Sequence, residues 1–202
     1  MIQISTKRLF DFLLSFFGLI ISGLIIFVAW IIASIETKSN GFFIQKRVGK
    51  NGKLFNLYKI KTMRKVIGVE TTITLKNDVR ITRSGKFFRD TKIDELPQLW
   101  NVLKGEMSLV GPRPLLMEYL PLYSPEQARR HEVKPGITGW AQVNGRNAIS
   151  WEDKFQLDVW YVDHQSLLLD LKILFLTIKL VFQRHGISAA GEVTMPRFTV
   201  RR

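Results

Sequence analysis

The hydrophobic pattern of the chain opens with one long apolar block. Residues 12–35 form a run of 24 uncharged residues, which is longer than the roughly 20 residues that a membrane-spanning helix needs. A removed signal peptide would have a shorter apolar core and a small-residue cleavage site before a polar mature chain. The block therefore predicts a membrane element.

The charges that flank this block are positive on both sides. Lys7 and Arg8 precede it, and Lys38 is the first of several basic residues that follow it. Since positive charge prefers the cytoplasmic side, this symmetry favours a re-entrant helix hairpin over residues 1–38, with Ser22-Gly23 as the bend. A single spanning helix is the alternative, because hydropathy alone does not separate the two.

The remaining residues, 39–202, are enough for one domain with its own core. In residues 41–63, apolar and basic residues alternate around a "GKNGK" turn, which predicts a β-hairpin or two extended segments. A helix is predicted from near Asp94 to Lys104, because Pro97 is tolerated only in a first turn and Gly105 can end it. Its expected buried stripe is Leu96, Leu99, Trp100 and Leu103.

Three further helices have recognisable starts or ends. Ser124 opens a capping box with proline at the first helical position, and Ser150 caps a helix with an acidic first turn. An apolar helix over Leu167 to Phe182 carries scattered charges, which favours a core or interfacial helix over a second span. The expected fold class is α/β, mostly helical with a small irregular β part, and membrane-associated.

The amino-acid composition limits the classes of binding partner that the chain could have. The formal charge is +13 and there is no cysteine, which excludes disulfides and thiolate chemistry. The positive charge implies an anionic partner, either nucleic acid, acidic lipid or a phosphorylated substrate. The membrane block argues against nucleic acid. The sequence has no Walker A, dinucleotide or zinc-protease motif.

An acidic pair stands out within this basic chain. At a helix start, Asp94 and Glu95 would lie at the positive end of the helix dipole, where ionised carboxylates are favoured. An ionised aspartate can coordinate Mg²⁺ or attack phosphorus. Neighbouring side chains point about 100° apart on a helix, which suits two separate roles. The alternative is structural, with Asp94 a cap and Glu95 a first-turn acid.

Several cations are candidates for binding phosphate. Arg113 stands between Pro112 and Pro114, so its backbone is restricted and its guanidinium suits bidentate phosphate binding. A larger set could complete a cationic site, although basic residues are often simply solvated; it comprises Lys59, Lys61, Arg89 and, near a glycine-rich loop, Arg146.

These motifs together resemble a known family. "KRLFD", "FIQKRVG", "YKIKTM", "DELPQLWNVLKGEMSLVGPRPLL" and "RRHEVKPGITGWAQVNGRNAISWEDKF" cover nearly the whole chain. It resembles the small monotopic phosphoglycosyl transferases of the bacterial sugar transferase family, and in particular those that initiate bacterial N-linked glycosylation. One departure is that no proline lies between Lys7 and Lys38, where the family breaks its membrane helix.

The resemblance implies an activity. Such enzymes move a phospho-sugar from a UDP-sugar to polyprenol (undecaprenyl) phosphate, release UMP and use Mg²⁺. Asp94 would be the nucleophile that forms a covalent phospho-sugar intermediate, with Glu95 as its partner and both as Mg²⁺ ligands. Arg89 and Arg113 would hold phosphate, Lys59 and Lys61 would support them, and Arg146 would contact the nucleotide.

The resemblance also implies a setting and leaves alternatives. The expected location is the inner membrane with the catalytic domain on the cytoplasmic face, against anionic lipids and beside downstream glycosyltransferases. We expect an N-acetylated amino sugar as donor. A UDP-hexose donor for capsule or exopolysaccharide is the alternative within the same chemistry. A non-catalytic adaptor that binds acidic lipids is the alternative from another class, and it would not need the acidic pair.

Overall fold

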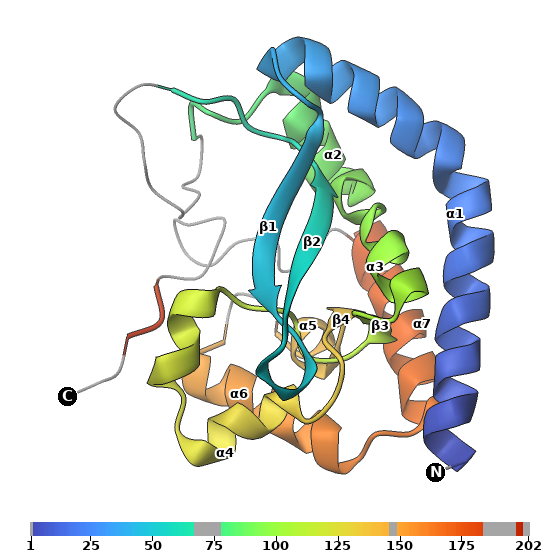
Figure 1. Cartoon of the computed structure of the whole chain (residues 1–202), viewed down its shortest axis with the longest axis vertical. Coiled ribbons are helices and arrows are strands. Elements are labelled where there is room, and N and C mark those ends of the chain that lie inside the picture. Colours follow the sequence, from blue (N-terminus) through green and yellow to red (C-terminus); the bar gives the residue numbers. More distant parts are fainter. Residues whose placement is uncertain (1, 67–77, 146–148, 184–196, 200–202) are drawn as a thin grey trace.

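The computed structural model describes residues 2–66, 78–145, 149–183 and 197–199. It is mostly helical with two small sheets, as the sequence predicted (Figure 1). The main helices are α1 (Ile2–Thr37), α2 (Arg83–Thr91), α3 (Gln98–Lys104), α4 (Pro125–Ala128), α5 (Trp140–Val143), α6 (Trp151–Asp163) and α7 (Leu167–Gln183). The strands are β1 (Phe42–Val48), β2 (Leu54–Ile60), β3 (Ser108–Val110) and β4 (Gly136–Thr138), and four 3₁₀ segments are η1 (Lys50–Gly52), η2 (Ile93–Glu95), η3 (Met117–Leu122) and η4 (Arg129–His131).

The apolar block forms α1, which is a single helix of 36 residues. The sequence predicted a hairpin broken at Ser22-Gly23; instead the helix runs through both residues and bends partway along its length (Figure 1). The Ser22 hydroxyl donates a hydrogen bond to the carbonyl of Gly18 at 2.6 Å, a contact that often bends helices. Among the described residues, α1 is the one helix long and apolar enough to cross a membrane.

Both ends of α1 dock on the same body of the protein. Near its start, Arg8 donates to the carbonyls of Val102 and Leu103 at 2.6 and 2.7 Å, which satisfies the last turn of α3. Near its end, Ala29 and Ala33 are buried in a cluster with residues of β2 and α2. The division into residues 1–38 and 39–202 stays a prediction, since α1 shares core contacts with the rest.

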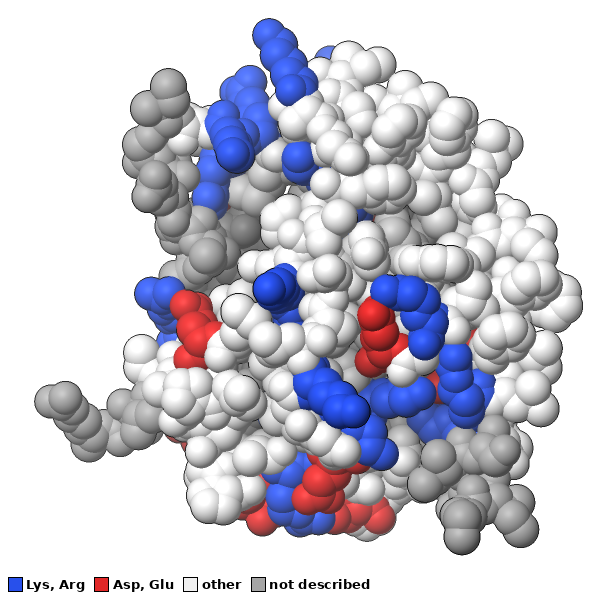
Figure 2. All heavy atoms as spheres, in the orientation of Figure 1, with Lys and Arg blue, Asp and Glu red and all other residues white. Residues whose placement is uncertain are grey.

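Between these ends, α1 exposes large apolar side chains to the surroundings. Ile20, Ile21 and Leu24 are 63, 78 and 74% exposed. In Figure 2 the upper right of the molecule, the side of α1, is almost free of charged residues, whereas basic side chains form separate patches at the upper left and lower right, with acidic side chains among the lower ones. Helix α7 adds a second exposed apolar stripe with Leu168, Leu171, Phe175 and Ile178, as expected of an interfacial amphipathic helix.

The predicted β-hairpin is confirmed. Strands β1 and β2 pair antiparallel around η1, and Phe43 lies opposite Lys59. Because side chains alternate between the two faces of a strand, Arg47, opposite Phe55, shares a face with Lys59. This hairpin brings Lys59 to the segment between α2 and α3.

The predicted helix from Asp94 to Lys104 is wrong in extent. Asp94 and Glu95 belong to η2, and α3 begins after Pro97. Gly105 does end the helix, with φ of 84°. The predicted buried stripe is also wrong, since Trp100 is 48% exposed and Leu99 is only partly buried, against Gly18 of α1.

The residues that α3 does bury are mostly polar. Gln98 and Asn101 are 1 and 0% exposed. The side chain of Asn101 accepts a hydrogen bond from the backbone N–H of Tyr58 at 3.1 Å and donates to the carbonyl of Asn56 at 2.7 Å. These two hydrogen bonds satisfy backbone groups of β2 and explain why Asn101 is buried, while Val102 of the same helix is buried in the hydrophobic core.

The remaining helix signals agree with the structure. Ser124 forms the predicted capping box with Gln127, and Ser150 accepts from the N–H of Asp153 at 3.0 Å. Helix α7 occupies the predicted range within one residue. Helix α2, which carries Arg89, was not predicted; its start is capped by Thr82, which accepts from Gly85.

Candidate active site

The acidic pair lies in a short turn between two helices. Lys92 adopts the left-handed conformation with φ of 63° and separates α2 from η2. Asp94 is 8% exposed, and within the described residues its Oδ1 has no hydrogen-bond partner. A buried carboxylate oxygen without a partner is costly. Asp94 is therefore not the helix cap of the structural alternative, and its free oxygen points to a ligand or a reaction.

Glu95, in contrast, is fully engaged with cations. Its Oε1 accepts from Lys59 Nζ at 2.8 Å and from Arg113 Nη2 at 2.5 Å, and its Oε2 accepts from Arg113 Nη1 at 3.3 Å. The arginine contact is bidentate, which fixes both side chains. Lys59 comes from β2 and Arg113 from the loop after β3, so Glu95 joins three separate elements.

The two carboxylates differ in pKa as a result. Burial, together with the nearby charge of Glu95, raises the pKa of Asp94 to about 6, against the opposing pull of Lys59. Burial also acts to raise the pKa of Glu95, but the charges of Arg113 and Lys59 hold it well below the usual range. Glu95 is thus held in its ionised form by its cations, while the pKa of Asp94 is raised to about 6.

The backbone of Arg113 is held from two sides. The N–H of Gly136 donates to the carbonyl of Pro112 at 3.0 Å. A Cβ on Gly136 would lie 2.1 Å from the backbone nitrogen of Gly111, so only glycine allows this approach. Arg130 donates from Nη2 to the carbonyl of Arg113 at 2.8 Å. The glycine at 136 therefore serves close backbone packing.

The other predicted cations are not all brought to the pair. Arg89 lies on α2 with its Nε donating to Thr62 at 2.8 Å, and its charge acts on Asp94 to lower the pKa of that carboxyl. Lys61 instead donates to Ser39 at 2.9 Å, and in the described part of the chain no hydrogen bond or ion pair joins it to either carboxylate. Arg146 lies outside the described residues.

Two cations near Arg113 were missed by the sequence analysis. Burial and the charge of Arg113 lower the pKa of Arg47 to about 10, and its Nε has no partner among the described residues. Lys154 of α6 is 6% exposed; burial lowers its pKa to about 8, with Arg113 contributing against the pull of Asp158. The hairpin register could have revealed Arg47, which shares a strand face with Lys59, whereas no sequence pattern marks Lys154.

The charges around the pair do not balance. Lys59 and Arg113 pair with Glu95, and Arg89 acts on Asp94, so three cations face these two carboxylates. Arg47 and Lys154 add positive charge near Arg113, each partly opposed by an acid outside the pair, Glu118 for Arg47 and Asp158 for Lys154. The charge of Arg113 helps to lower the pKa of both Arg47 and Lys154, and cations crowded into a partly buried site favour an anionic ligand. The site is therefore suited to bind an anion of multiple charge, such as a diphosphate.

The donor set also fits Mg²⁺, within limits. The described residues contain no group of three or more acidic or histidine side chains that could hold a metal ion. Mg²⁺ is usually bound by one or two carboxylates together with substrate phosphates, and the unpartnered Oδ1 of Asp94 is such a ligand. Glu95 could join only if Lys59 or Arg113 released one of its oxygens.

Comparison with known proteins points to one family. Residues 2–184 match the family described as bacterial sugar transferase. The chain is 55% identical over 193 residues to the sugar transferase EpsL of Bacillus subtilis, which covers 96% of this chain and 95% of that protein.

Relatives with a named substrate are longer proteins. The undecaprenyl-phosphate galactose phosphotransferase of Salmonella typhimurium is 40% identical over 198 residues, covering 89% of this chain and 41% of that protein. The UDP-glucose:undecaprenyl-phosphate glucose-1-phosphate transferase of Klebsiella pneumoniae is 40% identical over 183 residues, covering 85% of this chain and 39% of that protein. The chain thus spans about two-fifths of each of these two relatives.

Proposed function

Because the chain belongs to the bacterial sugar transferase family, we propose that it transfers a phospho-sugar from a UDP-sugar to polyprenol (undecaprenyl) phosphate and releases UMP. The observation that carries this proposal is the buried Asp94, whose Oδ1 has no partner and whose pKa is raised to about 6. A structural acid would be paired; a nucleophile must be free and able to ionise near neutral pH.

In the first step an ionised oxygen of Asp94 attacks the phosphorus attached to the sugar. The P–O bond to the UMP phosphate breaks, UMP leaves with the electron pair, and a covalent aspartyl phospho-sugar forms. In the second step an oxygen of the polyprenol phosphate attacks the same phosphorus. The aspartyl bond breaks, and Asp94 returns to its carboxylate form.

Arg113, Lys59 and Arg89 hold the diphosphate against Asp94. Two anions repel each other, so attack requires that the phosphate charge be compensated first. When bound, Mg²⁺ would supply part of that compensation, with Oδ1 of Asp94 as a ligand and Glu95 as a candidate second one. Glu95 would also orient Arg113 and Lys59 toward the phosphates through its ion pairs.

The donor is proposed to be a UDP-hexose. The sequence analysis expected an N-acetylated amino sugar, but the named relatives carry galactose and glucose in their names, which favours the alternative. A direct test is UMP release by purified protein with Mg²⁺, polyprenol phosphate and a panel of UDP-glucose, UDP-galactose and their N-acetylated counterparts. Release with none of these donors would contradict the enzyme and favour the lipid-binding adaptor.

We also propose that α1 enters and leaves the membrane on one face, the cytoplasmic face of the inner membrane. Support comes from the docking of both ends of α1 on one body and from the bend between them. The exposed stripe of α7 would rest at the interface, and the polyprenol product would pass to downstream glycosyltransferases.

The topology can be tested because the chain has no native cysteine. Cysteines placed singly at Gln3 and Lys53 should both react with an impermeant thiol reagent from the cytoplasmic side. Labelling from opposite sides would contradict the re-entrant topology and establish a spanning helix, without bearing on the chemistry of Asp94.

A further inference from the structure

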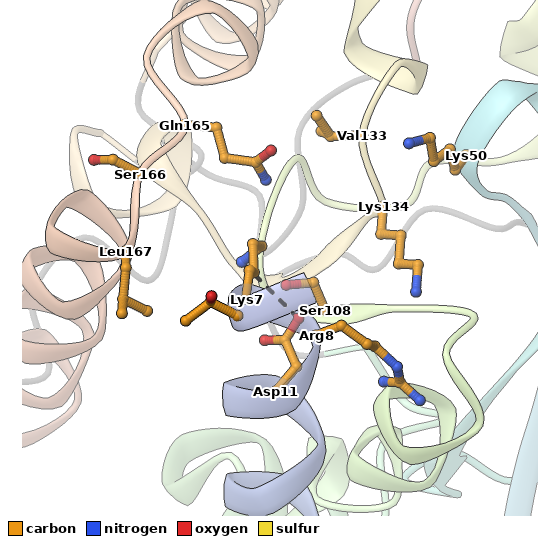
Figure 3. Close-up of a pocket in the computed structure, with 11 residues that line it drawn as sticks. Lys7, Arg8, Asp11, Lys50, Ser108, Val133, Lys134, Gln165, Ser166 and Leu167 are labelled. Atoms are coloured by element: carbon orange, nitrogen blue, oxygen red, sulfur yellow. Dashed lines mark ion pairs between the residues drawn. The ribbon is translucent and has the colours of Figure 1, made fainter. Parts of the chain in front are cut away.

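A pocket lined by both charged and apolar groups lies at the N-terminal end of α1, and neither Asp94 nor Glu95 lines it. It has a volume of about 340 Å³ and is formed by the first turns of α1, the segment before β4, the start of α7 and Lys50 (Figure 3). It adjoins the last turn of α3, whereas Asp94 precedes that helix. At 1.5 Å per residue, α3 alone separates the two sites by about 10 Å.

Two cations meet in this pocket. A Cβ on Gly105 would lie 3.2 Å from Arg8 Nη2 and 3.5 Å from Lys134 Nζ, so both groups approach the same point. Burial and the charge of Arg8 lower the pKa of Lys134. In Figure 3 the side chains of Arg8 and Lys134 point toward one space, with Lys50 at its edge.

The acidic groups nearby are already engaged. Asp170 accepts from Lys7 and from the hydroxyl of Tyr161, and Asp11 accepts from the N–H of Leu109 at 3.1 Å. Within the described residues, neither Lys134 nor Lys50 forms an ion pair with a carboxylate. Lys7, Arg8, Lys50 and Lys134 line the pocket with Asp11 as the carboxylate among the lining residues. Positive charge in excess of the lining carboxylate favours binding of an external anion.

The rim of the pocket is apolar. Leu167 lines it and is 37% exposed, its neighbour Leu168 is 80% exposed, and Leu9 on α1 is 58% exposed. A free phosphate would need none of this surface, whereas a lipid presents acyl chains beside its phosphate. If the exposed leucines enter the acyl region of a bilayer, the cations beside them lie at the level of the lipid headgroups.

We propose that this pocket binds the phosphate of an anionic phospholipid through Lys134, with Arg8 and Lys50 contributing and the apolar rim receiving the acyl chains. The inference rests on the membrane placement proposed above but not on the transferase chemistry. Such a lipid would fix the depth of the N-terminal end of α1 and, through the contacts of Arg8, the C-terminal end of α3.

The test uses the full chain in neutral detergent, with binding of dihexanoyl phosphatidylglycerol followed by native mass spectrometry. Dihexanoyl phosphatidylcholine and inorganic phosphate serve as separate probes. Lys134→Met should weaken phosphatidylglycerol binding by at least about tenfold, and Lys50→Met should weaken it less. Lys86→Met, at an exposed position on α2, is the matched control and should leave binding unchanged.

Three results would overturn the inference. Equal affinity in Lys134→Met and the unchanged protein would remove the pocket as the site. Equal weakening in Lys86→Met would show diffuse attraction to the positive surface. Inorganic phosphate binding as tightly as the lipid would show a free-phosphate site. Because UMP release is measured separately, failure here leaves the proposed function standing, and failure of that function does not change the lipid titration.

Discussion

Arg130 donates from Nη2 to the backbone carbonyl of Arg113 at 2.8 Å, while Asp158 accepts from the same guanidinium at 2.7 and 3.1 Å. Arg130 and Asp158 are 2 and 1% exposed, so a buried ion pair fixes the position of the arginine that clamps Glu95. Arg130 is in this sense a positioning residue, since it reaches the site through Arg113.

Replacing Arg130 by lysine should loosen Arg113 without removing its charge. A lysine cannot reproduce the two-sided contact of the guanidinium, so we expect KM for the UDP-sugar to rise by about tenfold, the equivalent of one lost hydrogen bond of about 1.4 kcal/mol. The acid limb of the pH profile should stay in place. The neighbouring Arg129→Lys, whose three ion pairs are at the surface, is the control. Equal KM in both variants would remove the positioning role.

The pH dependence of the chemical step should report Asp94. Because the nucleophile must be ionised and its pKa is raised to about 6, the single-turnover rate of UMP release should rise with pH through about 6 and then level off. Lys59 acts to lower the pKa of Asp94, so Lys59→Met should move this limb to higher pH. A rate independent of pH between 5 and 7 would argue against Asp94 as the group that ionises.

Arg113→Lys should impair the reaction strongly. Lysine lacks the paired N–H donors of the guanidinium, so both the bidentate contact with Glu95 and bidentate binding of a phosphate are lost. We expect kcat/KM to fall by about a hundredfold or more, in line with the loss of a charge-assisted pair. Lys61→Met serves as a control, because Lys61 contacts Ser39 and not the acidic pair. A smaller effect at Arg113 than at Lys61 would contradict the assignment.

Asp94→Asn should raise stability while it removes activity. A carboxyl with a raised native pKa binds its proton more tightly in the folded state, so the free energy of unfolding falls as pH rises between the unfolded value near 3.8 and about 6. The asparagine variant lacks this loss, so its Tm at pH 7 should be higher than that of the unchanged protein, whereas Asp90→Asn, at an exposed position of α2, should leave Tm unchanged. A lower Tm than the unchanged protein would mean that Asp94 has a stabilising partner.

The sequence predicted those parts of the fold that depend on local signals. Each of these signals involves residues that are close together in the sequence. They are the hairpin around "GKNGK", the capping residues Ser124 and Ser150, and the end of α3 at Gly105. The buried face of α3 was mispredicted, because Asn101 is buried through hydrogen bonds to a strand more than forty residues away. No periodicity in the sequence encodes that partner.

In the candidate site too, residues that are close in sequence were predicted, and residues brought together by tertiary packing were not. Asp94, Glu95 and Arg113 lie in one short stretch with proline spacing and were identified, and Lys59 is indeed joined to Glu95. Lys61 was included as a basic residue of the "YKIKTM" stretch, but its side chain contacts Ser39 and not the acidic pair. Lys154 and Arg47 reach Arg113 only through tertiary packing of α6 and the hairpin, so their place could not be predicted from spacing.

The most direct test of the central claim is to trap the covalent intermediate. The purified protein is incubated with Mg²⁺ and a UDP-hexose labelled in the phosphate attached to the sugar, without acceptor, and then quenched in acid. The account predicts one equivalent of UMP released, with the label held on the peptide that contains Asp94, and neither in Asp94→Asn. Release of UMP or retention of label by Asp94→Asn would contradict the assignment of Asp94 as the nucleophile.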